Sequence, residues 1–151
     1  MPTPQHRQSS SDLFAAQTLQ GLTVLVLEDA PVTQLLLVDV LEWAGAHVIL
    51  SITCQSALAL LQQRHFDVIL ANLVLPDGSG YTLLQTWRQW ERAHDLVLTP
   101  AIAVTAAVTA VSQAKATVAG FQSFVAKPYD FEHLFSAIVT AAGTSHRSAH
   151  R

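Results

Sequence analysis

The 151-residue chain is long enough for one complete hydrophobic core, because single domains usually hold roughly 100 to 150 residues. Half of its residues are hydrophobic and only 13% are charged, which favours strands that are buried on both faces. The net charge of −3 and pI near 6.1 exclude the basic field that binding to nucleic-acid backbones or anionic lipid requires.

The single cysteine, Cys54, excludes an internal disulfide framework and suits a reducing compartment. Residues 1–11 are polar and lack the apolar stretch of a signal peptide, and no apolar run reaches the roughly 18 residues that a membrane span needs. We therefore expect a cytoplasmic protein without membrane contact, in which Cys54 packs as a small apolar side chain.

The first predicted elements form a strand, an acidic pair and a helix. Residues 1–20 are expected to be a flexible extension with a short helical lead-in over 13–19, which Gly21 ends. The β-rich run 22–27 predicts a strand. Pro31 suits the first turn of a helix, and apolar residues at helical spacing extend that helix to Ala44 before the stop at Gly45.

The rest of the chain repeats the same alternation of apolar runs and helical periodicity. Strands are predicted at 47–52, 67–71, 100–104 and 121–126, and helices at 55–64, 81–92, 107–119 and 131–142. Five strand–helix units with short connections predict an α/β fold, a doubly wound, five-stranded parallel sheet in three α/β/α layers. The domain is expected over 21–142, followed by a disordered tail at 143–151.

Polar side chains follow the predicted strands at the edge where such sheets place their functional crevice. They are Glu28, Asp29, Asn72, Thr105 and Lys127. Paired carboxylates suit Mg²⁺, while a hydroxyl and an ammonium group suit the oxygens of a phosphoryl group. Each residue alone could be a helix cap or a solvated side chain, but their occurrence at successive strand ends favours one pocket.

Four short motifs carry a resemblance that extends over residues 22–142. They are Glu28-Asp29, Leu75-Pro76-Asp-Gly-Ser-Gly80, Val104-Thr105-Ala106 and Ala126-Lys127-Pro128. In these motifs the chain resembles the receiver domain of bacterial two-component response regulators. The resemblance implies a flavodoxin-like (βα)5 fold, a switch hydroxyl at Thr105, a phosphate contact at Lys127, a switch aromatic at Phe124 and a cis peptide bond before Pro128.

Asn72 is the departure, because it occupies the position of the phosphorylated aspartate. A carboxamide is a poor nucleophile and cannot form the mixed anhydride, and Asp77, the nearest other carboxylate, sits in a turn. The pocket would carry about −1 instead of about −2, so Mg²⁺ binding is expected to be possible but weakened. The amide could instead donate to Glu28 or Asp29.

We therefore predict an atypical receiver that is not an enzyme and acts as a phosphorylation-independent protein-interaction module. Expected partners are a sensor histidine kinase, a phosphotransfer protein or a downstream signalling protein, with a homodimer left open. The partner would select one of two states of Thr105, Phe124 and the surface near the fourth helix. Leu36, Trp43 and Trp90 are candidates for a second interface patch.

Two alternatives stay open. The natural residue 72 could be an aspartate that Asn72 has replaced, in which case the protein is an ordinary phospho-accepting receiver. A flavodoxin-like carrier or small enzyme is disfavoured, because Glu28-Asp29 presents negative charge where a phosphate-binding loop offers free N–H groups. A zinc site is also disfavoured, since the histidines, including His6, His146 and His150, lack ligand spacing.

Overall fold

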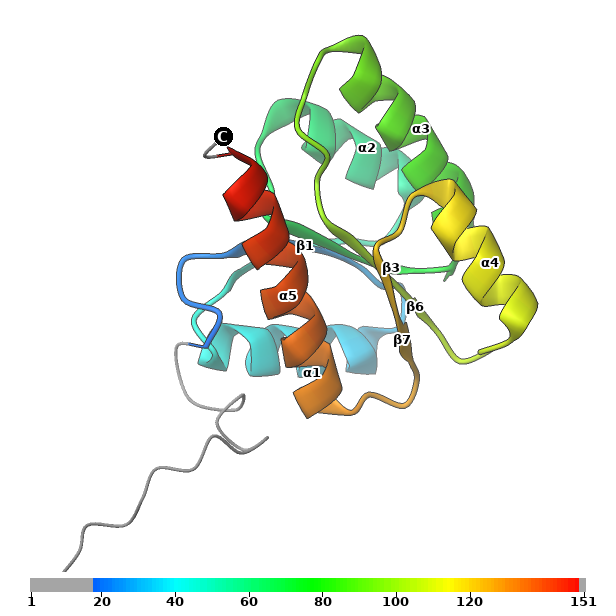
Figure 1. Ribbon diagram of the computed structural model, residues 1–151. Coiled ribbons are helices and arrows are strands. Elements are labelled where there is room, and N and C mark those ends of the chain that lie inside the picture. Colours follow the sequence, from blue (N-terminus) through cyan, green and yellow to red (C-terminus); the bar gives the residue numbers. More distant parts are fainter. Residues whose placement is uncertain (1–17, 150–151) are drawn as a thin grey trace, which may run out of the picture.

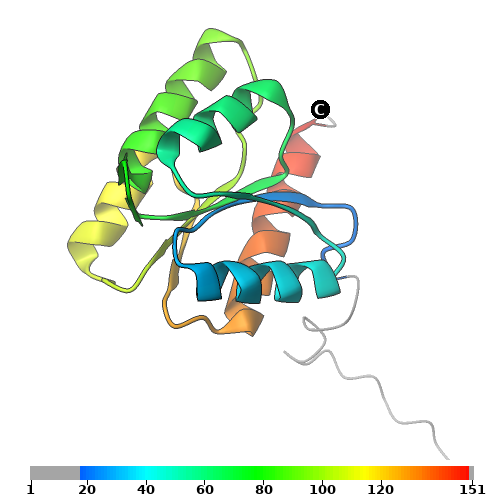
Figure 2. The same ribbon diagram turned by 180° about the vertical axis from the view of Figure 1, so that it is seen from behind.

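The computed structural model describes residues 18–149, with side chains described as far as Gly143. A five-stranded parallel sheet lies at the centre, and helices cover both of its faces (Figure 1, Figure 2). The strand order is β2-β1-β3-β6-β7, with strands β1 (Thr23–Leu27), β2 (His47–Ser51), β3 (Val68–Asn72), β6 (Ala101–Thr105) and β7 (Ser123–Ala126). The predicted fold class is confirmed.

The sheet has a hydrophobic core on each face, and each helix packs against one of the two cores. They are α1 (Pro31–Trp43), α2 (Cys54–Gln63), α3 (Gly80–Ala93), α4 (Ala110–Ala119) and α5 (Phe131–Ala149). Val24 and Val26 of β1 join the core beneath α1 and α5, whereas Leu25 and Leu27 join the core beneath α2, α3 and α4. Successive side chains of a strand point to opposite faces, so an unbroken apolar run fills both cores.

The domain differs from the sequence prediction at both of its ends. Leu19 is fully buried and its N–H donates to the carbonyl of Ala44 at 2.8 Å, so the fold begins before Gly21. Most of the predicted lead-in and the extension before residue 18 lie outside the described residues. Helix α5 continues to Ala149, so the expected tail from Gly143 begins inside a helix. No proline interrupts residues 143–149, which explains why the helix is not forced to end at Ala142.

Helix α4 begins three residues later than predicted. Thr109 is its N-cap, and a capping box joins the side chains and backbone N–H groups of Thr109 and Ser112. The reciprocal bonds satisfy the free donors of the first turn at this point, which leaves residues 106–109 as a loop. Gly120, with φ of 111°, ends the helix as expected.

A two-stranded hairpin between β3 and α3 was missed by the sequence prediction. It consists of β4 (Val74–Leu75) and β5 (Gly78–Ser79). Its turn is attached to α2, because the Asp77 carboxylate accepts the backbone N–H groups of Cys54 and Gln55 at 2.8 and 3.1 Å. These hydrogen bonds lower the pKa of Asp77, since they stabilise its charged form.

The same turn lies beside Cys54 and affects its thiol. Its thiol is half-buried and packs against the core beneath α2 and α3. Burial, followed by the negative charge of Asp77, raises the pKa of Cys54 from 9.0 to about 11. The predicted apolar packing of Cys54 is confirmed.

Adjacent residues on α5 offer a test of the core. Ile138 is fully buried, whereas Val139 is 39% exposed. We expect Ile138→Ala to lower the free energy of unfolding by about 2 to 5 kcal/mol, because it leaves a cavity. Val139→Ala, the matched control, should change it by less than about 1 kcal/mol. Urea denaturation of the two variants measures the difference, and equal losses would contradict the assigned orientation of α5.

The pKa of Cys54 can be tested by its alkylation rate. With a pKa of about 11, very little of the Cys54 thiol is ionised at pH 8. Cys54 should therefore react with iodoacetamide at pH 8 roughly a hundredfold more slowly than a free cysteine peptide. Asp77→Asn removes a negative charge, so the pKa should fall and the rate should rise, while burial keeps the rate below that of the peptide. Asp29→Asn is the control and should leave the rate unchanged.

Candidate functional site

The predicted site residues meet at one edge of the sheet. Asn72 and Thr105 are the last residues of the neighbouring strands β3 and β6. Glu28 directly follows β1, and Lys127 directly follows β7. Because all of these strands are parallel, their carboxyl ends lie side by side and bring the four residues to one edge of the sheet.

Glu28 is the centre of the site. It is buried, and its Oε1 accepts a hydrogen bond from Lys127 Nζ at 2.7 Å in an ion pair. Its Oε2 accepts from Asn72 Nδ2 at 3.4 Å and from the backbone N–H of Ala30 at 3.1 Å. Both carboxylate oxygens therefore have partners from within the chain. The amide of Asn72 acts as a donor here, which an ionised aspartate could not do.

Neither member of the acidic pair Glu28-Asp29 acts as a helix cap. The N-cap of α1 is Ala30, which makes no side-chain capping bond, so neither Glu28 nor Asp29 has that role. Asp29 is exposed beside the buried Glu28. Glu28 also receives a hydrogen bond at its backbone carbonyl from Gln34 Nε2 at 2.6 Å, which ties the first turn of α1 to the site.

Thr105 is buried and its hydroxyl oxygen accepts the backbone N–H of Ala107 at 3.1 Å. This bond shapes the loop 106–109 and is not a helix cap, because α4 begins only at Ala110. The carbonyl of Thr105 accepts the backbone N–H of Lys127 at 2.9 Å, which joins the ends of β6 and β7. The hydroxyl therefore lies at the junction between the site and the chain that leads to α4.

Phe124, Pro128 and Tyr129 lie close to Lys127 in the sequence and border the site. Phe124 is half-buried and packs against the core beneath α2, α3 and α4. The peptide bond between Lys127 and Pro128 is cis. Tyr129, which no sequence pattern indicated, is half-buried and has a raised pKa because of burial and the negative charge of Glu28. Tyr129 approaches Glu28 only through the fold, since the two residues lie far apart in the sequence.

The close packing around Gly80 brings the start of α3 against the site strand. A Cβ atom added to Gly80 would lie 2.7 Å from the carbonyl oxygen of Asn72. The backbone N–H of Gly80 donates to Leu73 at 3.0 Å, directly after Asn72. A larger residue at position 80 would push α3 away from the end of β3, so glycine is required by this close approach.

The donor set is a poor fit for Mg²⁺ in this arrangement. Mg²⁺ prefers oxygen ligands in near-octahedral geometry, and both oxygens of Glu28 are already engaged by N–H donors. Asp29 is the remaining carboxylate of the pair. Among residues 18–143, no group of three histidine, cysteine, aspartate or glutamate side chains is arranged to hold a metal ion. His6 and His150 lie outside the described residues, as does the side chain of His146.

The part of the chain that the structure describes also has no helix with the length and apolar character needed to cross a bilayer.

Comparison of the sequence with known proteins shows to which family the chain belongs. The sequence matches the model of the response regulator receiver domain over residues 24–139. It is 32% identical over 114 residues to an uncharacterized 14.6 kDa protein of Leptolyngbya boryana, covering 76% of this chain and 85% of that protein. It is 28% identical over 134 residues to the signal transduction histidine-protein kinase BarA of Escherichia coli, covering 89% of this chain but only 14% of the kinase.

Solved structures agree with these sequence matches. The receiver domain of the sensor histidine kinase PA1611 from Pseudomonas aeruginosa, which has a magnesium ion in its active-site cleft, is 27% identical with a TM-score of 0.73. The similarity covers 82% of this chain and 98% of that domain. A putative response regulator from Chloroflexus aurantiacus, 24% identical, has the same fold with a TM-score of 0.74 over 81% of this chain and 98% of that structure. The chain belongs to the response regulator receiver domain family of two-component signalling.

Proposed function

We propose that this receiver transmits signals through protein contacts without phosphorylation of residue 72. One observation carries the proposal: Glu28 accepts hydrogen bonds from both Asn72 and Lys127, so its buried charge is satisfied from within the chain. Asn72 offers a carboxamide where the chemistry requires a carboxylate nucleophile. The Asp77 carboxylate does not replace it, because that group is bound to the first turn of α2.

The site residues take the following roles in this proposal. Lys127, which would contact a phosphoryl group in an ordinary receiver, neutralises Glu28. Thr105 and Phe124 form the two-state element whose arrangement a partner selects. A ligand can shift such an equilibrium only by its differential affinity for the two states, so partner contacts supply the free energy that phosphorylation would otherwise supply.

Exposed apolar side chains provide surfaces for these contacts. On α4, Val111 is 69% exposed and Val118 is 81% exposed. On α1, Leu36 is 44% exposed and Trp43 is 54% exposed. Trp90, the third candidate, is half-buried and packs against the core, so it offers less exposed apolar surface. Large exposed apolar side chains that gather on one helix are typical of interaction sites.

The partners we propose are a sensor histidine kinase, a phosphotransfer protein or a downstream signalling protein. Several relatives are sensor kinases, of which the chain matches a small part. Receiver domains are in general signalling modules, and we propose that this chain likewise has no enzymatic activity of its own. A homodimer and a cytoplasmic location stay predictions.

A replaced aspartate is the second candidate. The retention of Thr105 and Lys127 at the strand ends is what an active receiver would show. The genomic codon for residue 72 decides between the two readings. An aspartate codon would make the protein an ordinary phospho-accepting receiver.

Incubation with acetyl phosphate and Mg²⁺ tests the main proposal. We expect the intact mass of the unsubstituted protein to stay unchanged and that of Asn72→Asp to increase by one phosphoryl group, because the other contact residues are in place. Asn72→Asp/Asp77→Asn should still be modified, which excludes Asp77 as the acceptor. A labile phosphoryl adduct on the unsubstituted protein would sink the proposal, and an inert Asn72→Asp would show that more than the nucleophile is lost.

Metal titration tests the charge argument. We expect Asn72→Asp to bind Mg²⁺ at least about tenfold more tightly than the unsubstituted protein, because it adds a carboxylate ligand and removes an amide donor from Glu28. Isothermal titration calorimetry with Mg²⁺, repeated with Mn²⁺, measures the difference. Asp29→Asn in the same background should remove the gain. Equal affinity of the two proteins would contradict the proposed weakening by Asn72.

A further inference from the structure

A pocket of about 600 Å³ lies at the amino-terminal edge of the sheet. Asp67, which directly precedes β3, and the segment 96–99, which leads to β6, both line it. Other lining residues come from the end of α2, from α3 and from α5. Because the strands are parallel, their amino and carboxyl ends lie at opposite edges of the sheet. The pocket is therefore separate from the edge that carries Asn72.

The buried part of the lining is apolar. Leu61 at the end of α2, Phe66 just before β3 and Trp87 of α3 all line the pocket and are buried. Ligand sites are typically clefts of about 300 to 1,000 Å³ that are lined mainly by apolar and aromatic side chains. Both the size of this pocket and its buried lining therefore suit a small molecule with an apolar body.

Three consecutive residues, Leu96, Val97 and Leu98, form an apolar wall of the pocket. They are 47%, 59% and 49% exposed. Connecting segments usually carry small and polar residues, whereas this one places three large apolar side chains in solvent. The apolar wall thus offers surface that a bound molecule would remove from water.

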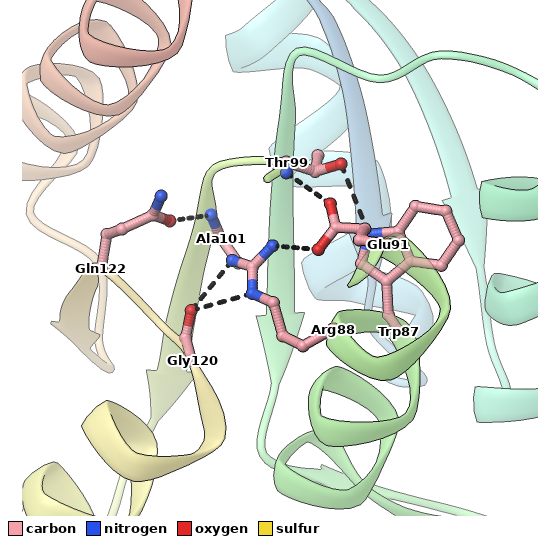
Figure 3. Close-up of polar contacts among 7 residues, drawn as sticks. All are labelled: Trp87, Arg88, Glu91, Thr99, Ala101, Gly120 and Gln122. Carbon is pink, nitrogen blue, oxygen red and sulfur yellow. Dashed lines mark hydrogen bonds and ion pairs between the residues drawn. The ribbon is translucent and has the colours of Figure 1, made fainter. Parts of the chain in front are cut away.

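Hydrogen bonds to α3 fix both ends of the apolar wall. Asp95, with φ of 53°, turns the chain at the end of α3, and the backbone N–H of Leu96 donates to the carbonyl of Glu91 at 2.9 Å. Glu91 Oε2 accepts the backbone N–H of Thr99 at 2.5 Å, and the Thr99 hydroxyl accepts from Trp87 Nε1 at 3.3 Å (Figure 3). These bonds favour a pocket that is formed before a ligand binds.

Glu91 is itself held by a buried ion pair (Figure 3). Arg88 Nη1 donates to Glu91 Oε1 at 2.7 Å, and both side chains are buried. Arg88 Nη2 and Nε also donate to the carbonyl oxygen of Gly120 at 2.9 and 3.3 Å. Both carboxylate oxygens of Glu91 therefore have partners, so this residue adds no unpaired negative charge behind the apolar wall.

Arg64 supplies a positive charge at the pocket. It is exposed and lines the pocket, and its guanidinium lies 5.4 Å from the centre of the Phe66 ring. Within residues 18–143, no ion pair includes Arg64. A guanidinium group presents a planar fork of N–H donors that matches the two oxygens of a carboxylate. Arg64 is therefore available to bind a carboxylate that enters the pocket.

The carboxylate of the lining, Asp67, is already engaged. Its Oδ2 accepts the backbone N–H of Thr23 at 2.8 Å, and its Oδ1 lies 3.2 Å from His65 Nε2. A cationic ligand would have to compete with these partners for Asp67, whereas an anionic ligand would find Arg64 unpaired. The charges around the pocket therefore favour an anion.

We propose that this pocket binds a compact amphipathic carboxylate. Its apolar body lies against Phe66, Trp87 and the apolar wall, and its carboxylate binds Arg64. An ion pair with an exposed arginine contributes little free energy, so apolar burial supplies most of the affinity and Arg64 selects the charge of the ligand. The site goes beyond the proposed receiver function, and it does not depend on the chemistry of residue 72.

Three probes with one apolar body and different charges test the site in the full chain. They are 2-naphthoate, the neutral 2-naphthamide and the cationic 2-naphthylmethylamine. We expect 2-naphthoate to bind about threefold or more tightly than the amide, and the amine to bind most weakly. In NMR spectra, 2-naphthoate should shift the indole N–H signal of Trp87 and the amide signals of 61–67 and 96–99.

Two results with these probes would overturn the proposal. Equal affinity of the three probes would contradict the assignment to a carboxylate. Absence of binding at millimolar concentration, or shifts across the surface that leave the Trp87 signal unchanged, would contradict the site itself.

Arg64→Gln tests the selection of charge. We expect this variant to bind 2-naphthoate and 2-naphthamide equally, because the cation is lost, while its affinity for the amide stays unchanged. Arg92→Gln is the matched control, since Arg92 is also exposed and does not line this pocket. It should keep the preference for 2-naphthoate. A preference that survives in Arg64→Gln would overturn the role of Arg64.

Leu96→Ser tests the apolar wall. Because Leu96 is 47% exposed, we expect the fold to persist, which an unchanged far-UV circular dichroism spectrum would show. Both 2-naphthoate and 2-naphthamide should bind about threefold or more weakly, since apolar contact is lost. Val118→Ser on α4, where Val118 is 81% exposed and lies outside this pocket, should leave both affinities unchanged. Unchanged affinities in Leu96→Ser would overturn the role of the apolar wall.

Discussion

The ion pair between Glu28 and Lys127 joins the two strands that carry the outer parts of the site. Asn72 lies on β3, one of the two strands between them in the sheet, and its amide donates to the same carboxylate. A buried carboxylate needs partners, and an aspartate at position 72 would add a second negative charge next to it. The amide avoids that repulsion and supplies a hydrogen bond to Glu28.

In the proposed scheme, the hydrogen bonds within the pocket also affect how the rest of the domain transmits a signal. In the proposed scheme, the state of Thr105 depends on a partner, because nothing covalent forms at residue 72. The loop that Thr105 shapes leads directly to the start of α4. The other end of α4 is held by Arg88 through a separate buried network.

Much of the fold could be predicted from local pattern. Unbroken apolar runs indicated strands buried on both faces, and the proline and glycine residues marked the ends of helices. The hairpin of β4 and β5 was missed, because strands of two residues leave no periodicity. The start of α4 was placed too early, because the apolar residues of 107–109 resemble a helix and the capping box of Thr109 and Ser112 was overlooked.

The residue types at the strand ends, including the asparagine at position 72, were determined by the sequence alone, and parallel strands place their carboxyl ends at one edge whatever the details of packing. Only the tertiary structure decided that Glu28, rather than Asp29, receives both Lys127 and Asn72. It also decided that Arg88, Glu91 and Gly120 meet. Hydrogen-bond partners depend on distances between atoms of different elements, and a linear pattern contains no such distances.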